Sequence, residues 1–303
     1  MADHQPTTSH SVVEQLILPA VRDLGDGFEV RRALPSAKRR MVGPFIFLDH
    51  FGPLSFGPQQ GMEVRPHPHI GLSTLSYLRR GEIVHRDSLG SEQVIRAGDV
   101  NWMTAGRGIV HSERSPKAQQ TAGGELFGQQ IWVALPKQQE ETAPSFHHHP
   151  ADSLPTLQQD GVTITVVAGL AYGLRSPVQT YSDLMCLNMA VDAGARVKLP
   201  AEYSERAILV VSGTLRVEGE DTDYGVGQLV VLKPDCEIVL RSARPTELLL
   251  IGGEPLAERR YIEWNFVSSS RERIEQAKDD WRNGRFAGIQ GETDFIPLPE
   301  PGK

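Results

Sequence analysis

The sequence predicts an all-β protein that consists of two tandem β-barrels and a short helix near the C-terminus. The 303 residues include 29 glycines and 21 prolines, more helix breakers than a helical bundle tolerates. Apolar segments are short and are bounded by Gly, Pro, Asp or Asn, as in strands that are joined by turns. One such β unit recurs in the second half of the chain. Short strands, frequent turns and an internal repeat together favour two similar barrels.

Strands are expected in both halves of the chain, with a polar connection between them. In the first half they cover residues 45–48, 72–78, 94–95, 100–103 and 130–135. In the second half they cover residues 162–167, 184–191, 207–211, 229–232, 238–240 and 247–251. Residues 136–155 are polar and contain proline, which is typical of a connection between domains. We therefore expect an N-terminal domain over residues 1–140 and a C-terminal domain over residues 141–303.

One helix is expected, close to the C-terminus. Ser269 and Glu272 have the spacing of a capping box. A one-sided stripe follows, which consists of Ile274, Ala277, Lys278 and Trp281. Gly284 is placed to end the helix. We expect this helix to pack on a barrel and to take no part in the chemistry.

The repeated unit contains two turn glycines and an apolar strand. In the first half these glycines are Gly81 and Gly98, and in the second half they are Gly213 and Gly227. In both copies an apolar strand begins two residues after the second glycine. The similar order and spacing indicate two copies of one β unit.

Two short motifs in the first half contain the residues that we expect to bind a metal. An Arg-Pro-His-Pro-His segment places His67 and His69 two positions apart. In an extended segment such side chains project from the same face, and Pro68 disfavours a helix here. His111 and Glu113 form a second pair with the same spacing. On two antiparallel strands these four side chains can meet in one site, which suits Fe, Ni, Cu, Mn or Zn.

The distribution of histidine favours a metal site in the first barrel alone. All ten histidines lie between His4 and His149. By their spacing from the repeat glycines, the positions in the second half that correspond to the four candidate ligands lie near Leu199, Ala201, Leu240 and Ser242. These residues cannot build the same site, because they lack imidazole and carboxylate groups. We therefore expect one barrel to bind a metal and the other to bind none.

The remaining histidines are not expected to bind the metal. His85 and Asp87 are also two positions apart, but no second pair is placed to join them. We expect them to have a structural role or to support the ligands, rather than to bind the metal. Residues 147–149 are three histidines in the polar connection, which we expect to face solvent. His50 is expected to be a hydrogen-bonded turn residue, with orientation of a ligand as the alternative.

Other site chemistries find little support. No Gly-x-Ser-x-Gly or Gly-x-Gly-x-x-Gly motif is present. The nucleophile elbow of a serine hydrolase and a dinucleotide-binding loop are therefore disfavoured. Cys186 and Cys236 both lie outside the histidine-bearing half. Trp102, Met103 and Phe127 can line a pocket, but core packing is the simpler interpretation.

Composition limits the partners and the location. The chain has 31 Lys and Arg against 38 Asp and Glu, a net charge of −7, which disfavours direct binding to nucleic acid. Two cysteines cannot form a disulfide framework, so a reducing cytoplasm is the expected compartment. The opening residues lack a leader pattern, and no run approaches the roughly 18 apolar residues of a membrane span. We expect a cytoplasmic protein outside the membrane, and a monomer.

Several strings, in order, resemble signatures of the pirin family of the cupin superfamily. They are Asp49-His50-Phe51-Gly52-Pro53, Pro66-His67-Pro68-His69, Ser76-Tyr77-Leu78 and Trp102-Met103-Thr104-Ala105-Gly106-Arg107-Gly108, followed by His111 and Glu113. The resemblance is strong from Val30 to Pro136 and weaker as far as residues 297–299. Many cupins have a ligating Glu soon after the second His, whereas Ser73 and Thr74 stand there in this chain.

The resemblance implies a bicupin, a protein of two cupin barrels, with an iron site in the N-terminal barrel. Its ligands would be His67, His69, His111 and Glu113, with Glu113 in place of the usual cupin carboxylate. Fe(II) is the expected ion, with Ni, Cu, Mn or Zn as alternatives. The implied activity is that of a quercetinase, a dioxygenase that cleaves flavonols with dioxygen. Glu113 would then also be the general base that accepts the 3-hydroxyl proton of the flavonol.

The resemblance also implies a different kind of function. Some family members are metal- or redox-sensing proteins that bind a protein partner, as transcriptional co-regulators or as modulators of metabolic enzymes. The oxidation state of the metal would then change the affinity for the partner without turnover. A purely structural metal is the least favoured alternative, because closed sites usually hold zinc by four Cys or His ligands.

Overall fold

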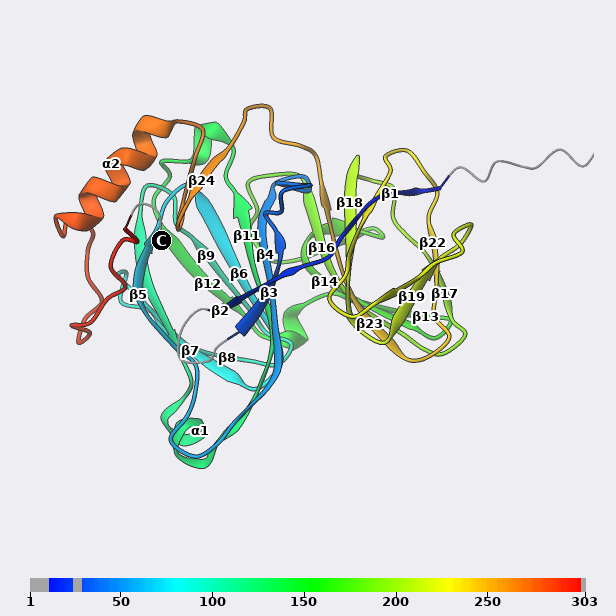
Figure 1. Cartoon of the computed structure of the whole chain (residues 1–303), viewed down its shortest axis with the longest axis horizontal. Coiled ribbons are helices and arrows are strands. Elements are labelled where there is room, and N and C mark those ends of the chain that lie inside the picture. Colours follow the sequence, from blue (N-terminus) through cyan, green and yellow to red (C-terminus); the bar gives the residue numbers. More distant parts are fainter. Residues whose placement is uncertain (1–10, 24–28, 301–303) are drawn as a thin grey trace, which may run out of the picture.

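Two β-barrels lie next to each other in the computed structural model, which describes residues 11–23 and 29–300 (Figure 1). Each barrel has one large and one small antiparallel sheet. The prediction of an all-β protein with two tandem barrels is therefore confirmed. None of the helices in the described ranges is long and apolar enough to cross a membrane.

The first barrel is formed mainly by the first half of the chain. Its large sheet has the order β12 (Ser145–His149), β9 (Val100–Thr104), β6 (Leu72–Arg80), β11 (Gly124–Ala134), β4 (Phe45–Phe56), β3 (Glu29–Leu34) and β2 (Ala20–Asp23). Its small sheet has the order β5 (Glu63–His69), β10 (Ile109–Arg114), β7 (Glu82–Asp87) and β8 (Glu92–Arg96). A short helix that the sequence did not predict, α1 (Lys117–Ala122), lies between β10 and β11.

The second barrel is formed mainly by the second half. Its large sheet has the order β1 (Val13–Ile17), β21 (Leu229–Leu232), β18 (Glu205–Ser212), β23 (Thr246–Gly253), β16 (Leu184–Val191), β14 (Val162–Ala171) and β13 (Thr156–Gln159), and β15 (Leu174–Arg175) pairs with β14. Its small sheet has the order β17 (Arg196–Lys198), β22 (Val239–Arg241), β19 (Thr214–Val217) and β20 (Asp223–Gly225). Two 3-10 turns, Lys137–Gln139 and Ala151–Ser153, flank β12. The chain ends with β24 (Tyr261–Glu263), β25 (Phe266–Ser268) and α2 (Arg271–Arg282).

The internal repeat corresponds to equivalent strand pairs in the two barrels. In the first barrel Tyr77 of β6 lies opposite Val100 of β9. In the second barrel Leu209 of β18 lies opposite Leu229 of β21. All four repeat glycines have φ between 80° and 86°. Glycine is favoured at these positions because other residues rarely adopt a positive φ.

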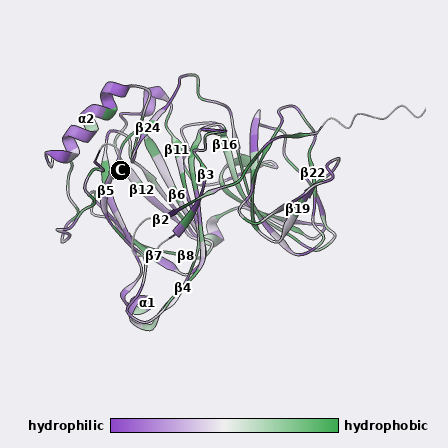
Figure 2. Cartoon of the chain, in the orientation of Figure 1, coloured by the Kyte–Doolittle hydropathy of each residue, from purple (hydrophilic) through white to green (hydrophobic). Residues whose placement is uncertain are grey.

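A continuous apolar layer joins the two large sheets. Successive side chains of a strand point to opposite faces. Leu209 on β18 therefore joins Leu75 and Ile131 of the first barrel in one buried cluster, whereas Ile208 points into the interior of the second barrel. Burial on both faces explains why β18 is apolar almost throughout, and Figure 2 shows hydrophobic residues along the strands of both barrels.

Each end of the chain packs on the barrel that the other half forms. Strand β1 pairs with β21 of the second barrel, whereas Ile274 and Ala277 of α2 pack against Ile70 and Phe266 beside the first barrel. Strand β12 also joins the first barrel, through antiparallel pairing with β9. Of these three elements the sequence predicted only the C-terminal helix. It could not indicate which surface that helix contacts, because a local pattern does not specify its tertiary neighbours.

The helix α2 begins one residue later than the capping pattern indicated. Ser270 is the N-cap, and its hydroxyl accepts a hydrogen bond from the Arg273 amide. Ser269 instead contacts the first barrel, where its amide and hydroxyl donate to the buried Glu140 carboxylate. The helix ends before Gly284, which has a φ of 63°. The expected helix is thus present, with its start fixed by a tertiary contact.

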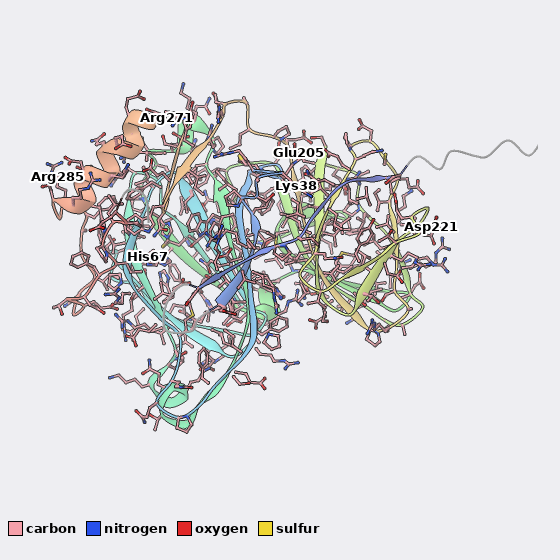
Figure 3. The ribbon with its side chains drawn as sticks, in the orientation of Figure 1. Lys38, His67, Glu205, Asp221, Arg271 and Arg285 are labelled. Atoms are coloured by element: carbon pink, nitrogen blue, oxygen red, sulfur yellow. The ribbon has the colours of Figure 1, made fainter. Side chains whose placement is uncertain are left out.

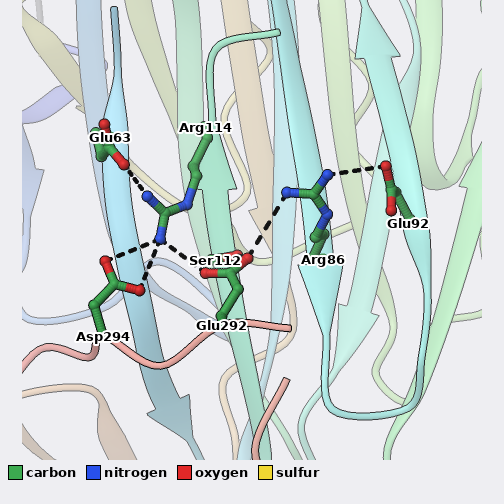
Figure 4. A network of polar contacts seen from close by, with 7 residues as sticks. All are labelled: Glu63, Arg86, Glu92, Ser112, Arg114, Glu292 and Asp294. Atoms are coloured by element: carbon green, nitrogen blue, oxygen red, sulfur yellow. Dashed lines mark hydrogen bonds and ion pairs between the residues drawn. The ribbon is translucent and has the colours of Figure 1, made fainter. Parts of the chain in front are cut away.

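The segment that follows α2 is held against the outer face of the small sheet of the first barrel (Figure 4). Arg114 of β10 forms ion pairs with Glu292 and Asp294 of this segment and with Glu63 of β5. The Ile296 amide also donates a hydrogen bond of 2.8 Å to the carbonyl of Pro66 in β5. Pro66 precedes the first histidine of the expected metal site, so the C-terminal segment reaches the candidate site.

Candidate metal centre

The two histidine motifs lie on neighbouring antiparallel strands. His111 of β10 lies opposite His67 of β5, and Ile109 lies opposite His69. A bulge follows His111 in this pairing, so Glu113 is opposite Val64. The two proline residues of the first motif keep the segment extended, as the sequence predicted. Figure 3 shows His67 within the first barrel.

The structure brings His67, His69 and His111 together. One ring nitrogen of each lies within 4.8 Å of the corresponding atoms of the other two, and the Nε2 atoms of His69 and His111 are 3.1 Å apart. All three residues are at most 6% exposed. They form the one cluster of three or more His, Cys, Asp or Glu side chains with metal-site geometry among the residues that the structure describes.

The outer ring nitrogens have partners that orient two of these imidazoles. His67 Nδ1 lies 2.8 Å from the carbonyl oxygen of Arg65, and His69 Nδ1 lies 3.1 Å from that of Asn265. A carbonyl only accepts hydrogen bonds, so each Nδ1 carries a hydrogen and each Nε2 keeps its lone pair. A metal is coordinated through such lone pairs. The three residues therefore fit a divalent transition metal.

Burial keeps the three imidazoles neutral. Desolvation is the largest cause that lowers the pKa of His67, to about 4. It also lowers the pKa values of His69 and His111 well below the ordinary histidine value, and the neighbouring imidazoles lower them further. Neutral imidazole is the form that coordinates metals. The cluster is thus in its ligating form at neutral pH.

Glu113 lies beside the three histidines but outside their compact cluster. Its side chain lines the same pocket, and its Oε1 accepts a hydrogen bond of 3.1 Å from the Ser76 hydroxyl. Burial raises the pKa of this carboxyl group, although His85 and the Ser76 hydrogen bond act in the opposite direction. A raised pKa brings a carboxylate closer to the range of an efficient general base. The role of Glu113 as fourth ligand stays a prediction.

A pocket of about 550 Å³ opens beside the cluster, a size that suits a small organic molecule. Its lining residues come from the first barrel and from the C-terminal segment, and they include His67, His69, Glu113, Trp264 and Ile296. The interior of the second barrel differs, because Leu199 and Leu240 are buried there in an apolar cluster.

One wall of the pocket is aromatic and adjoins the histidines. Phe47 and Trp132 stack with ring centroids 4.0 Å apart, and Trp132 meets the His69 ring edge-on at 5.0 Å. The Arg32 guanidinium lies 4.3 Å from the centroid of the Phe47 ring and pairs with Asp49 through two hydrogen bonds of 2.8 Å. Such a wall favours a flat aromatic ligand.

His85 contacts the cluster without joining it, as the sequence interpretation proposed. Its Nδ1 lies 3.4 Å from His111 Nδ1, and its Nε2 lies 3.0 Å from Asp87 Oδ2. His85 is 3% exposed and stacks on Phe146 of β12 at a centroid distance of 4.2 Å. The pair of His85 and Asp87 therefore supports a candidate ligand.

The expectation that residues 147–149 face solvent in a connection between domains is confirmed for His147 alone. These three histidines belong to strand β12, which is paired with β9, and His148 Nδ1 lies 2.8 Å from Asn101 Oδ1. Only His147 is exposed. The polar composition indicated a solvated connection because a strand at the edge of a sheet can be polar.

The expectation of core packing for Trp102, Met103 and Phe127 is confirmed.

His50 is buried on β4 and does not contact the candidate ligands. Its Nδ1 lies 3.1 Å from the Gln129 amide nitrogen, and its Nε2 has no hydrogen-bond partner in the described part of the chain. Desolvation lowers its pKa to about 4, and the charges of Arg31 and Arg79 add to this effect. The alternative of an orienting role at the metal site is therefore not supported.

His50 makes stability depend on pH. The unfolded chain binds a proton at His50 near pH 6.5, whereas the folded chain does so only near pH 4. The contribution of His50 to the free energy of unfolding is thus fully present above pH 6.5. It decreases as the pH falls toward 4, by at most about 1.4 kcal/mol per pH unit. His50→Phe should make this decrease shallower in urea titrations from pH 7 to 4. Parallel curves for the variant and the parent protein over this range would contradict the assignment.

Several residues of the site were not predicted from the sequence. Ser76 and Gln130, which share a hydrogen bond of 2.8 Å beside Glu113, could have been found from the inward-facing positions of their strands. Asn265 and Ile296 could not, because they follow the first motif by almost 200 residues or more. Only the packing of the C-terminal segment places them at the pocket.

Comparisons with known proteins agree with this architecture. The model of the pirin family matches residues 27–133, and the model of the pirin C-terminal cupin domain matches residues 186–287. A pirin-like protein of Caulobacter vibrioides is 49% identical over 92% of this chain and 96% of its own length. A pirin of Rattus norvegicus is 31% identical over 91% of this chain and 93% of its own length.

A solved structure shows the same similarity in three dimensions. The crystal structure of a quercetin 2,3-dioxygenase from Acinetobacter baumannii matches with a TM-score of 0.88 at 33% identity. The match covers 95% of this chain and 96% of that chain. The similarity therefore extends over both barrels.

Proposed function

Because the chain belongs to the pirin family of two-cupin proteins, we propose that it is a metal-dependent dioxygenase of the quercetinase type. The metal would be held by His67, His69 and His111, with Glu113 as the fourth ligand. Fe(II) is the proposed ion, and a flavonol and dioxygen are the proposed substrates. The observation that carries the proposal is a buried cluster of three neutral imidazoles at the base of an aromatic pocket.

The pocket has the properties that a flavonol requires. Phe47 and Trp132 provide a flat apolar surface next to the histidines. Arg32 and Asp49 provide a polar edge for hydroxyl groups on the rings. The matched quercetin 2,3-dioxygenase of A. baumannii supports the same substrate class.

The residues of the pocket have separable tasks in this proposal. A bound divalent metal would supply Lewis acidity and one-electron redox chemistry. Glu113 Oε1 would accept the proton of the 3-hydroxyl group, and burial raises the pKa of this carboxyl group toward the value that such a transfer needs. The Ser76 hydroxyl would hold the carboxylate in place. Trp264 and Ile296 would limit the access of water to the pocket.

Glu113→Gln tests the function and the assigned base together. The metal-loaded parent protein should consume dioxygen with quercetin, as measured by an oxygen electrode and by the loss of quercetin absorbance. Glutamine is nearly isosteric but accepts no proton in this role, so kcat should fall by about 100-fold or more. Metal content must be measured for both proteins, because Glu113 is also a proposed ligand.

Glu63→Gln is the matched control for this experiment. Glu63 lines the same pocket, but its side chain is 49% exposed and pairs with Arg114, so turnover should change by less than about threefold. Turnover by Glu113→Gln at the parent rate, with equal metal content, would contradict the base assignment. Absence of dioxygen consumption by the metal-loaded parent protein would contradict the proposed dioxygenase activity. It would favour the alternative function, a metal-sensing protein that binds a protein partner.

A further inference from the structure

We propose that Asp87 and His85 form a positioning relay that keeps the metal-facing nitrogen of His111 unprotonated. The inference rests on the proposed metal site, but it does not depend on the dioxygenase activity. His67 and His69 are oriented by backbone carbonyls. His111 has no such carbonyl partner among the hydrogen bonds of the described residues, and its Nδ1 faces His85 instead. Another group must therefore select its tautomer.

The strand register places the relay on the inner face of the small sheet. Strand β7 is paired with β10 so that Asp87 lies opposite His111 and His85 lies opposite Glu113. His85 and Asp87 are two positions apart on the same strand, so both side chains point inward. Their side chains are 4% and 0% exposed. A buried His–Asp pair this close to a candidate ligand is costly unless its hydrogen bonds are satisfied.

The orientation of Asp87 is fixed by the turn that follows β7. Its Oδ1 accepts hydrogen bonds from the Leu89 and Ser91 amides, at 2.9 and 3.0 Å. Its Oδ2 is left to face His85 Nε2 at 3.0 Å. Burial tends to raise the pKa of Asp87, but the hydrogen bonds from His85 and Ser91 prevail and lower it. Asp87 is thus an ionised acceptor with a set direction.

The direction of each hydrogen bond follows from this acceptor. An ionised carboxylate only accepts, so His85 Nε2 carries a hydrogen and His85 Nδ1 keeps a lone pair in the neutral ring. That lone pair faces His111 Nδ1 at 3.4 Å and can accept its hydrogen. His111 Nε2, which lies 3.1 Å from His69 Nε2, then keeps its lone pair. The relay therefore leaves a ligand atom free on the side of the cluster.

Stacking on Phe146 fixes the plane of the relay. The His85 and Phe146 rings are 4.2 Å apart and inclined by 10°. This contact prevents the His85 ring from turning away from His111. It also gives a function to strand β12, the edge strand that carries Phe146.

Asp87→Asn tests the relay with little change in shape. The Asn oxygen should keep the two amide contacts of the turn, so its NH₂ group should take the place of Oδ2. This group donates to His85 Nε2, which places the hydrogen of His85 on Nδ1, opposite His111 Nδ1. His111 then favours a hydrogen on Nε2, the ligand atom. We expect Zn(II) affinity, measured by chelator competition, to fall 10- to 100-fold.

Two further measurements separate the relay from a general loss of structure. In the parent protein without metal, ¹⁵N NMR of the His111 ring should show the hydrogen on Nδ1, and in Asp87→Asn it should shift toward Nε2. Asp99→Asn is the matched control, because Asp99 is a buried turn aspartate of the same barrel that accepts amide hydrogen bonds from Arg96 and Ala151. It should change Zn(II) affinity by less than about twofold.

The outcomes distinguish this inference from the proposed function. A parent protein that binds no Zn(II) overturns the metal site and the relay with it. Parent-like affinity and an unchanged tautomer in Asp87→Asn overturn the relay alone. Equal losses of affinity in Asp87→Asn and Asp99→Asn also overturn it. Should Asp87→Asn fail to fold, His85→Phe takes its place. This variant keeps an aromatic ring stacked on Phe146 but removes the hydrogen bonds to Asp87 and His111. Its Zn(II) affinity is then compared with those of the parent protein and of Asp99→Asn.

Discussion

His69→Ala is expected to remove metal binding almost completely. His69 is central to the cluster, because its Nε2 lies 3.1 Å from His111 Nε2 and its ring adjoins Trp132 of the pocket wall. Loss of one of three neutral imidazoles leaves too few strong donors for a divalent transition metal. The affinity for Zn(II) or Fe(II) should fall by more than about 100-fold, beyond the usual effect of losing a residue that only supports a ligand. Metal analysis of freshly purified protein gives the readout.

Thermal unfolding provides a second measure of the same loss. A ligand that binds only the folded state stabilises it by about 2.7 kcal/mol when present at 100 times its Kd. Added metal should thus raise the Tm of the parent protein but not that of His69→Ala. His148→Ala is the matched control, because His148 is bonded to Asn101 on the same barrel outside the cluster. Stoichiometric metal in His69→Ala would contradict the assignment of the site.

Glu140→Ala should cause the largest loss of stability among these variants. Glu140 is 5% exposed and lies 2.9 Å from Nε of Arg260, whose side chain is 0% exposed. It also accepts hydrogen bonds from Ser268 and Ser269. Removal of Glu140 leaves the buried Arg260 with only the longer ion pair of 3.8 Å to Glu258, whose side chain is 43% exposed. Loss of one partner from a buried pair costs about 3–5 kcal/mol, and we expect a value near the lower end. Urea titration measures this loss.

The adjacent residue offers a matched control. Glu141 is paired with Arg273, but its side chain is 58% exposed, so Glu141→Ala should cost less than about 1 kcal/mol. Because Glu140 holds the segment that brings Asn265 to His69, its loss should also weaken Zn(II) binding and increase hydrogen exchange in residues 260–268. Equal stability of the two variants would contradict this role for Glu140.

The sequence predicted the parts of the fold that depend on local patterns. Turn glycines and apolar segments indicated both barrels, and the repeat located equivalent strand pairs around Gly81 and Gly213. The spacing of His67 and His69 placed both rings on one face of a strand, and the structure joins them to His111. These inferences succeeded because strand periodicity determines the face to which a side chain points.

Contacts between distant segments could not be predicted in this way. The histidines at residues 147–149 read as a solvated connection, and only pairing with β9 shows them to be a strand. The start of α2 shifted by one residue because Ser269 bonds to Glu140. The support of His69 by Asn265 has no counterpart in the local sequence. Such contacts depend on which surfaces meet, and a single sequence does not encode that in a visible pattern.

The exchange of chain ends between the barrels has a consequence for biosynthesis. Asn265 follows His69 by 196 residues, which at 5–20 residues per second is a delay of about 10–40 s on the ribosome. During that interval the nascent first barrel lacks Asn265, Trp264 and Ile296, so its histidines are open to cellular ions from this side. Docking of the last-made segment then supplies the Asn265 carbonyl that orients His69 and completes one wall of the pocket. The metal centre can therefore reach its final geometry only after nearly the whole chain has been synthesised.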